Sequence, residues 1–129
     1  RLGHGIRLAD VLADPRRRAL VDEAIERGAH LEVCPTSNVH TGAAPSVAEH
    51  PIVALWRAGV SVGINTDNQL MSRITLVGEC EALLAQTPLA LTDLARMQLE
   101  AAHHSFLPPQ IKAAAIAAIT ACIQALSAA

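Results

Sequence analysis

Two residues combine a reactive side chain with a position beside an apolar segment or a tight turn. Asp67 follows the apolar run 60–64 (VSVGI) within the sequence NTDN. A carboxylate held at the end of a strand can bind a metal ion through oxygen or act as a general base. His4 stands between Gly3 and Gly5, which leave room for a ligand, and imidazole suits metal binding, proton transfer or charge stabilisation near neutral pH.

Both residues also have a purely structural interpretation. Asp67 is of a type that caps a following segment or forms an Asx turn, and a lone histidine is more often structural than functional. The other histidines have no spacing that would let two of them share a metal ion, so we expect them to be structural or solvent-facing: His30, His40, His50, His103 and His104.

The elements that would position Asp67 and His4 alternate along the chain. Asp14-Pro15 resembles a helix start, and the helical pattern ends at Gly28. The strand-like segment 30–34 follows, then a second helical pattern that ends at Gly59, then the strand-like run 60–64. Strands and helices at this pitch predict βαβ units and a parallel sheet, whose strands end at one common edge. Three polar clusters would meet at that edge: Gly3 to Gly5, Thr36 to Asn38, and Asp67 with Asn68.

The remainder of the chain is predicted to be helical and to complete only part of a domain. Helices are expected over Ile74 to Ala85, over Thr92 to His103 with Thr92 as N-cap, and over Gln110 to about Leu126. Only two complete strands and the tail of a third, just before His4, are visible, and so few parallel strands leave unpaired edges. We therefore expect the second half of a larger domain, preceded by further sequence.

Composition excludes several classes of protein. The 129 residues are 51% hydrophobic and 17% charged, with a formal net charge of -2, which argues against disorder and against binding to nucleic acid or an anionic membrane. No apolar run is expected to reach the length of a membrane span. The cysteines Cys34, Cys80 and Cys122 are odd in number and lack metal-finger spacing, so we expect no disulfide, inert buried thiols and a cytoplasmic location.

Motifs of several enzyme classes are missing from the sequence. It contains no phosphate-binding glycine loop and no G-x-S-x-G nucleophile elbow. The H-x-E and P-C-x-x-C pair of the cytidine-deaminase type of zinc site is absent as well, because Cys34 precedes Pro35 and has no partner. That type of zinc site is excluded.

Five segments together resemble the C-terminal part of the adenosine deaminase family, in the metal-dependent amidohydrolase superfamily. They occur in the family's order and extend to about residue 108: RLGHGIRL (1–8), LEVCPTSNVHTG (31–42), EHP (49–51), AGVSVGINTDN (58–68) and SFLP (105–108). Each segment is weak evidence of kinship when taken singly, whereas G-H-G, C-P-T-S-N and N-T-D in this order are specific.

The resemblance implies an α/β fold, the C-terminal half of a (β/α)8 TIM-type barrel followed by C-terminal helices, over residues 1–129. It implies a Zn²⁺-dependent hydrolase of purine salvage that converts adenosine or deoxyadenosine and water to inosine or deoxyinosine and ammonia. The family's counterpart of Asp67 is a zinc ligand that helps to deprotonate the attacking water. The counterpart of His4 stabilises charge when C6 of the purine becomes tetrahedral. Zinc lowers the pKa of water towards ~7, which suits this chemistry.

The sequence departs from the family pattern at two positions. Asn68 stands where many members have an aspartate that contacts N7 of the purine, and an amide can donate to that acceptor at any pH, so Asn68 is the expected substrate-binding residue. Glu100 stands where asparagine is common in the family. Small purine nucleosides are the expected partners, with no nucleic acid and no membrane.

The remaining zinc ligands and the catalytic glutamate of the family lie upstream of its counterpart of His4, so the chain alone is expected to be inactive. Two alternatives remain open: a sister deaminase of adenine or of a modified adenosine nucleoside, and a non-catalytic remnant of the family. A freestanding α/β binding module is disfavoured by the unpaired strand edges.

Overall fold

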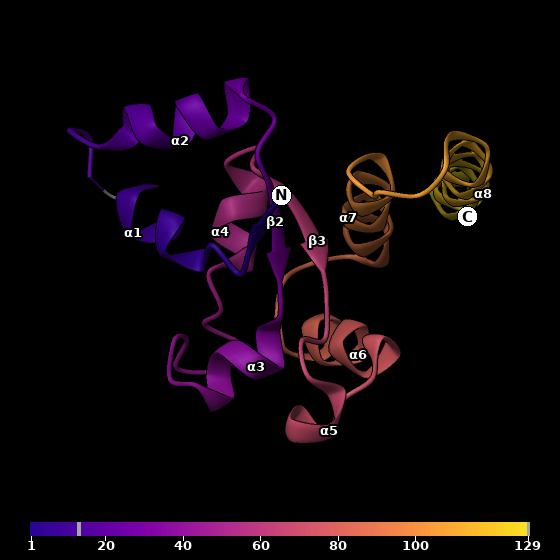
Figure 1. Ribbon diagram of the computed structural model, residues 1–129. Helices are drawn as coiled ribbons and strands as arrows, with labels where there is room; N and C mark the ends of the chain where they lie inside the picture. The colour runs from indigo at the N-terminus through magenta and orange to yellow at the C-terminus, as the bar shows by residue number, and fades with distance from the viewer. Residues whose placement is uncertain (13, 129) are drawn as a thin grey trace.

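The computed structural model describes residues 1–12 and 14–128 and contains a small parallel sheet. Its three strands pair in the order β1-β2-β3, with Leu31 opposite both Leu2 and Val62: β1 (Leu2–Gly3), β2 (His30–Val33) and β3 (Ser61–Ile64). Beyond the carboxyl ends of the strands lie three helices, seen below the sheet in Figure 1: α3 (Pro35–His40), α5 (Gln69–Ser72) and α6 (Leu76–Gln86). The predicted parallel sheet and its shared edge are confirmed.

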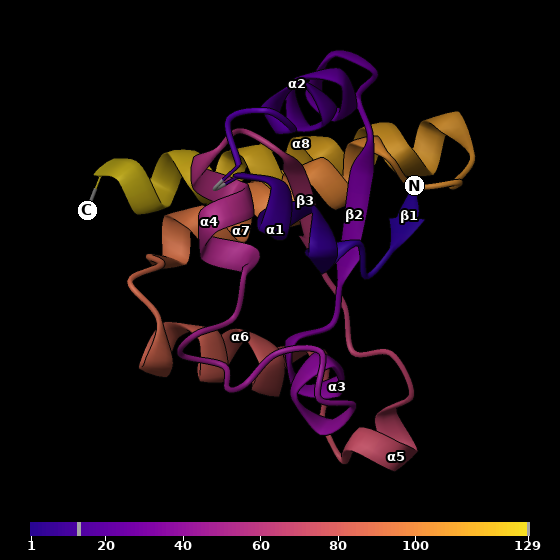
Figure 2. The same ribbon diagram turned by 90° about the vertical axis from the view of Figure 1, so that its left-hand side faces the viewer.

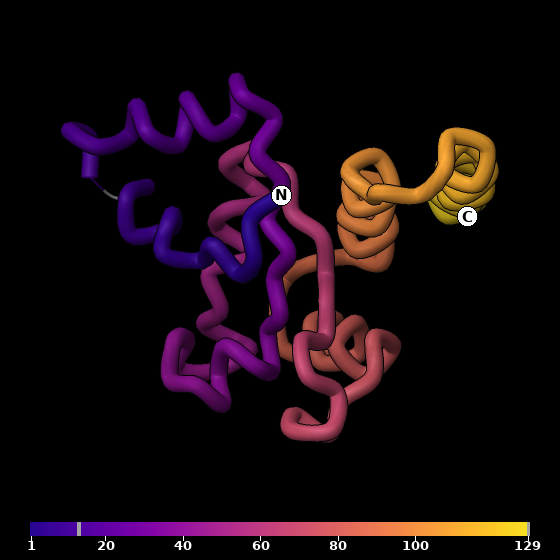
Figure 3. Tube along the Cα trace, in the orientation of Figure 1, coloured from indigo at the N-terminus to yellow at the C-terminus, as the bar shows by residue number. Residues whose placement is uncertain are grey.

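Helices cover both faces of the sheet (Figures 1 and 2). On one side lie the 3-10 helix η1 (Ile6–Leu8), α1 (Ala9–Leu12) and α4 (Ile52–Arg57), and on the other side lies α7 (Leu91–His103). Helix α2 (Arg18–Glu26) lies towards the amino ends of the strands, and α8 (Pro109–Ala128) packs on the outer side of α7. The chain leaves β2 at the carboxyl edge, passes through α3 and returns through α4 to β3 (Figure 3).

The core is built from the alternating apolar residues of the strands and from α4. Leu31 and Val33 of β2 and Val62 of β3 are at most 1% exposed, and Ile52 and Leu55 of α4 are fully buried against them. Burial of each such side chain contributes ~1.5–3 kcal/mol to folding relative to its exposure to water. This packing fixes the strand ends from which the polar residues project.

The opposite face of the sheet carries polar residues that contact α7. The ring of His30 stacks on that of His104 with their centroids 4.6 Å apart, and the Ser61 hydroxyl donates to a Glu100 carboxylate oxygen at 2.7 Å. Position 63, which also faces α7, is occupied by glycine, and a Cβ there would lie only 2.8 Å from Nε2 of His30. Glu100 therefore serves as the acceptor for the hydroxyl of Ser61.

Three local expectations are wrong. Asp14 does not cap a helix, since its carboxylate accepts from the backbone N–H of Arg16 and α2 begins at Arg18. The cap of α7 is Ala90, two residues before the expected cap Thr92, and its N–H donates to the Asp93 carboxylate. Residues 36–38 belong to a helix instead of a turn, because Pro35 occupies its first position.

Helix α8 also corrects an expectation from composition. It is 20 residues long, and an 18-residue window in it has a mean hydropathy of 1.7 and is not buried. By length and composition alone, it meets the requirement for a membrane span, because Lys112 is its one charged residue. The expectation that no apolar run reaches the length of a membrane span is therefore wrong.

The three cysteines differ in their exposure. Cys122 on α8 is exposed and Cys80 is half-buried, so the expectation of buried thiols holds only for Cys34.

Candidate active site

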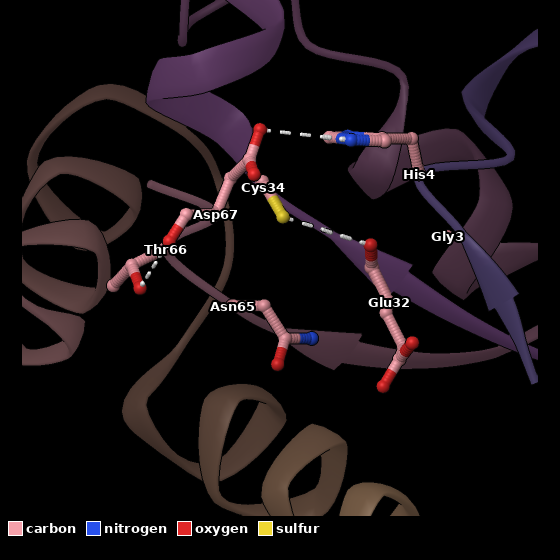
Figure 4. A pocket seen from close by; sticks show the side chains of 7 residues that line it. All are labelled: Gly3, His4, Glu32, Cys34, Asn65, Thr66 and Asp67. Carbon is pink, nitrogen blue, oxygen red and sulfur yellow. Dashed lines mark hydrogen bonds and ion pairs between the residues drawn. The ribbon is translucent and has the colours of Figure 1, made fainter. Parts of the chain in front are cut away.

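A pocket opens at the carboxyl ends of the three strands (Figure 4). It has a volume of about 360 Å³ and is lined by Gly3, His4, Glu32, Cys34, Asn65, Thr66 and Asp67. A second pocket of about 260 Å³ shares His4 and Asp67 with the first and extends between η1 and α3. The two predicted reactive residues thus lie where both pockets meet.

His4 and Asp67 face one another across this region (Figure 4). Nε2 of His4 lies 3.7 Å from Oδ2 of Asp67, and the side chains are 44% and 45% exposed. Both residues have left-handed backbones, with φ of 56° and 57°, a conformation that costs about 1–3 kcal/mol outside glycine and that clusters at functional sites. Gly5, which follows His4, is also left-handed, with φ of 63°, and a Cβ on this residue would lie 2.7 Å from the side chain of Leu31.

Helix α3 holds both side chains through two consecutive residues. The Ser37 hydroxyl donates to Oδ2 of Asp67 at 2.7 Å, and the amide nitrogen of Asn38 lies 3.1 Å from Nδ1 of His4. Ser37 and Asn38 are 5% and 3% exposed, so each contact joins a buried group of α3 to a half-exposed side chain. The sequence predicted that these residues share an edge, and the structure shows that they touch.

Glu79 anchors α3 from the opposite side, a role that was not predicted from the sequence. This carboxylate of α6 is fully buried and accepts hydrogen bonds from the backbone N–H and the hydroxyl of Thr36, at 3.1 Å and 3.0 Å. Burial raises the pKa of Glu79, and the hydrogen bonds from Thr36 oppose that rise. One signal was available in the sequence: Glu79 lies one helical turn before the buried Leu83 and shares its face.

His50, expected to be structural or solvent-facing, is a second buried residue that contacts α3. It is 3% exposed, its Nδ1 accepts from the backbone N–H of Ile52 at 3.0 Å, and its Nε2 lies 3.2 Å from Oδ1 of Asn38. Spacing gave no indication of the contact, since the two side chains meet only after the chain has folded back from α3 to α4.

Asn68 is adjacent to Asp67 but lines neither pocket. Its Oδ1 accepts from the backbone N–H of Met71 at 3.1 Å and caps the short helix α5, and the residue is exposed. Substrate binding by Asn68 therefore stays a prediction. Its observed contact is that of an Asx cap.

Cys34 forms part of the pocket wall as a neutral thiol. Burial, and next the negative charge of Asp67, raise its pKa to about 11, and its sulfur donates weakly to the carbonyl of Glu32. A protonated thiol is a poor nucleophile, and the Glu32 carboxylate of the same pocket is paired with Arg1, so His4 and Asp67 are the candidate reactive groups.

The two buried histidines predict acid sensitivity. Burial, joined at His30 by the nearby His104, lowers the pKa of His30 and of His50 from 6.5 to about 4. The unfolded chain then binds more protons between these values, so stability is full above about pH 6.5 and falls as the pH approaches 4. We expect a loss of about 1–2 kcal/mol per histidine by pH 5, partly offset by Glu79, whose raised pKa acts in the opposite direction.

Urea unfolding of the protein between pH 7.5 and 5 measures this loss, and histidine NMR over the same range reports the charge of each ring. His103, which is exposed, provides an internal reference signal. A free energy of unfolding that stays constant over this range, together with rings already protonated at pH 5.5, would contradict the neutral state of His30 and His50.

The described residues supply part of a metal site. Asp67 offers a half-exposed carboxylate that Ser37 orients, which is suitable chemistry for one zinc ligand. Within residues 1–12 and 14–128, no group of three or more His, Cys, Asp or Glu side chains is arranged to hold a metal ion. A catalytic zinc takes about three protein ligands, so a zinc at Asp67 requires ligands from beyond the described residues.

Comparison with known proteins finds relatives that match most of this chain. A family model for adenosine deaminase matches residues 1–122. The adenosine deaminase of Mycobacterium sp. strain JLS is 42% identical over 113 residues, which cover 84% of this chain and 31% of that protein. The adenosine deaminase of Mycobacterium tuberculosis strain H37Rv shows the same identity and coverage. The chain thus spans about a third of the length of these relatives.

Two solved structures share the fold. An adenine deaminase from Arthrobacter aurescens superposes with a TM-score of 0.85 at 24% identity and covers 96% of this chain and 36% of its own. A zinc-bound amidohydrolase from Burkholderia ambifaria superposes with a TM-score of 0.79 at 22% identity, covering 98% and 34%. The predicted partial barrel with C-terminal helices is thereby confirmed, and at these identities the likeness concerns the fold alone.

Proposed function

Because this chain belongs to the adenosine deaminase family, we propose that it is the C-terminal part of a zinc-dependent hydrolase that deaminates adenosine or deoxyadenosine. The products would be inosine or deoxyinosine and ammonia, in purine salvage. One observation carries the proposal: His4 and Asp67 face each other at 3.7 Å in a pocket at the carboxyl ends of parallel strands. Reactive groups of α/β enzymes gather at this end of the sheet.

Asp67 would bind Zn²⁺, with the other ligands supplied by sequence outside this chain. Zinc, when bound, supplies Lewis acidity that lowers the pKa of water towards ~7. Ser37 donates to Oδ2 of Asp67 and so restrains the carboxylate in one orientation, as partners of metal ligands do. This carboxylate is also the nearest base of the chain to His4 and to any water between them.

His4 would act at its Nε2, which points towards Asp67 and into the pocket. Addition of water to C6 of the purine creates charge on the attacking oxygen and on the ring. A ring N–H held in advance at that place stabilises the charge without reorganisation. Since Asn38 already contacts Nδ1, Nε2 is the nitrogen that is left to face the substrate.

The test is an assay of the full-length, zinc-loaded protein with adenosine, deoxyadenosine and adenine, with ammonia and the purine product both measured. We expect turnover of the two nucleosides and none by residues 1–129 alone, which supply a single proposed zinc ligand. Turnover of adenine alone would favour the sister deaminase. Zinc binding without release of ammonia from any of the three would favour the non-catalytic remnant.

A further inference from the structure

A chain of hydrogen bonds connects the backbone of α4 with the candidate active site. The N–H of Ile52 lies 3.0 Å from Nδ1 of His50, and Nε2 of His50 lies 3.2 Å from Oδ1 of Asn38. The amide nitrogen of Asn38 then lies 3.1 Å from Nδ1 of His4. His50 and Asn38 are each 3% exposed, so the first two contacts are shielded from water, and the third joins the buried amide of Asn38 to the half-exposed ring of His4.

The hydrogen bond from Ile52 to His50 determines which group donates and which accepts in each of the other hydrogen bonds. A backbone N–H can only donate, so Nδ1 of His50 accepts. A neutral imidazole has one donor and one acceptor nitrogen, which places the proton of His50 on Nε2, facing Asn38. Burial favours the neutral ring, since it lowers the pKa of His50 to about 4.

The direction then passes through Asn38 to His4. The N–H of His50 requires an acceptor, which is Oδ1 of Asn38, and this orientation turns the NH₂ group towards His4. An amide NH₂ only donates, so Nδ1 of His4 accepts. The proton of neutral His4 therefore resides on Nε2, the nitrogen that faces Asp67 and the pocket.

We propose that His50 is a positioning residue which, through Asn38, makes His4 a hydrogen-bond donor at Nε2 towards the substrate. The consequence for catalysis depends on the function proposed above, whereas the protonation pattern of His4 does not. The opposite tautomer would present a lone pair where a donor is needed, and its charge-stabilising contact would be lost.

The direct test is two-bond ¹H–¹⁵N NMR of the full-length, zinc-loaded protein labelled with ¹⁵N-histidine, which reports the protonated nitrogen of each ring. We expect His4 and His50 both to carry the proton on Nε2. A wild-type spectrum with the proton of His4 on Nδ1 would overturn the proposal, and no variant is required for that result.

Two variants of His50 connect the tautomer with catalysis. His50→Leu keeps the bulk of the side chain but removes the donor, so the side-chain amide of Asn38 is free to flip. We expect kcat to fall at least about tenfold with zinc content unchanged. In His50→Gln the side-chain amide can accept from Ile52 and donate to Asn38, so most of the loss should be recovered. His103→Leu, on an exposed position of α7, is the matched control.

Asn38→Asp serves if His50→Leu fails to fold. The carboxylate still accepts from His50 but cannot donate, so His4 should move its proton to Nδ1, with a fall in kcat and little change in KM. Unchanged kcat and an unchanged His4 signal in either folded variant would overturn the relay. The expected tautomers in a protein that deaminates nothing would instead contradict the proposed function and leave the relay intact.

Discussion

Replacement of Asp67 by alanine in the full-length protein is expected to abolish zinc retention and deamination together. The chain provides this single carboxylate at the meeting point of both pockets, and within its described residues no cluster of three ligating side chains can substitute for it. Loss of one of about three protein ligands removes much of the affinity for a catalytic zinc. Without the metal, the attacking water keeps a pKa far above neutrality.

The measurement is metal analysis after dialysis, combined with ammonia release from adenosine. Asp22→Ala is the matched control, because this exposed carboxylate forms an ion pair with Arg18 and belongs to α2, which lies towards the amino ends of the strands (Figure 1). An Asp67→Ala protein that retained wild-type zinc and activity would show that Asp67 is no ligand. A protein that retained zinc but lost activity would assign Asp67 a role in proton transfer alone.

Replacement of His4 by alanine should give the complementary result, with zinc retained and kcat lowered by a factor of at least ~10². Nε2 of His4 lies 3.7 Å from Oδ2 of Asp67, whereas the Ser37 hydroxyl donates to the same oxygen at 2.7 Å. The carboxylate therefore keeps its orientation in the variant. What disappears is the ring N–H that faces the reacting centre.

Steady-state kinetics and metal analysis on the same preparation separate this result from that of Asp67→Ala. His103→Ala, an exposed histidine at the end of α7, controls for the loss of an imidazole as such. An unchanged kcat in His4→Ala would mean that the ring is only structural. A loss of zinc in step with activity would mean that His4 helps to hold the metal.

The short helix α3 connects these two predictions in physical terms. Its residues 36–38 contact three separate parts of the chain, since Thr36 binds Glu79 of α6, Ser37 binds Asp67, and Asn38 binds His4. A helix of six residues is not stable alone, so it owes its conformation to these buried contacts. A change at Glu79 or His50 is thus able to reach the pocket without touching it.

Local patterns in the sequence were enough to predict the frame of the site. Apolar segments such as 60–64, punctuated by glycine and proline, predicted parallel strands, and the polar residues after each strand predicted a common edge that bears His4 and Asp67. Such features depend on neighbours within a few residues, and parallel strands bring their carboxyl ends together whatever the details of packing. The same locality explains the errors at Asp14 and Thr92, since α2 begins four residues after Asp14 and the backbone N–H of Ala90 bonds the Asp93 carboxylate at the start of α7.

The tertiary structure decided which polar residues serve the site. Glu79 reaches Thr36 across 43 residues, and His50 reaches Asn38 across 12 residues from the loop before α4. Helical spacing places Glu79 on the same face as Leu83, but neither contact can be read from the sequence, because the partner of a buried carboxylate or imidazole is decided by folding. The orientation of each ring and amide was likewise decided by folding, since a hydrogen bond has a donor and an acceptor only once both groups are in place.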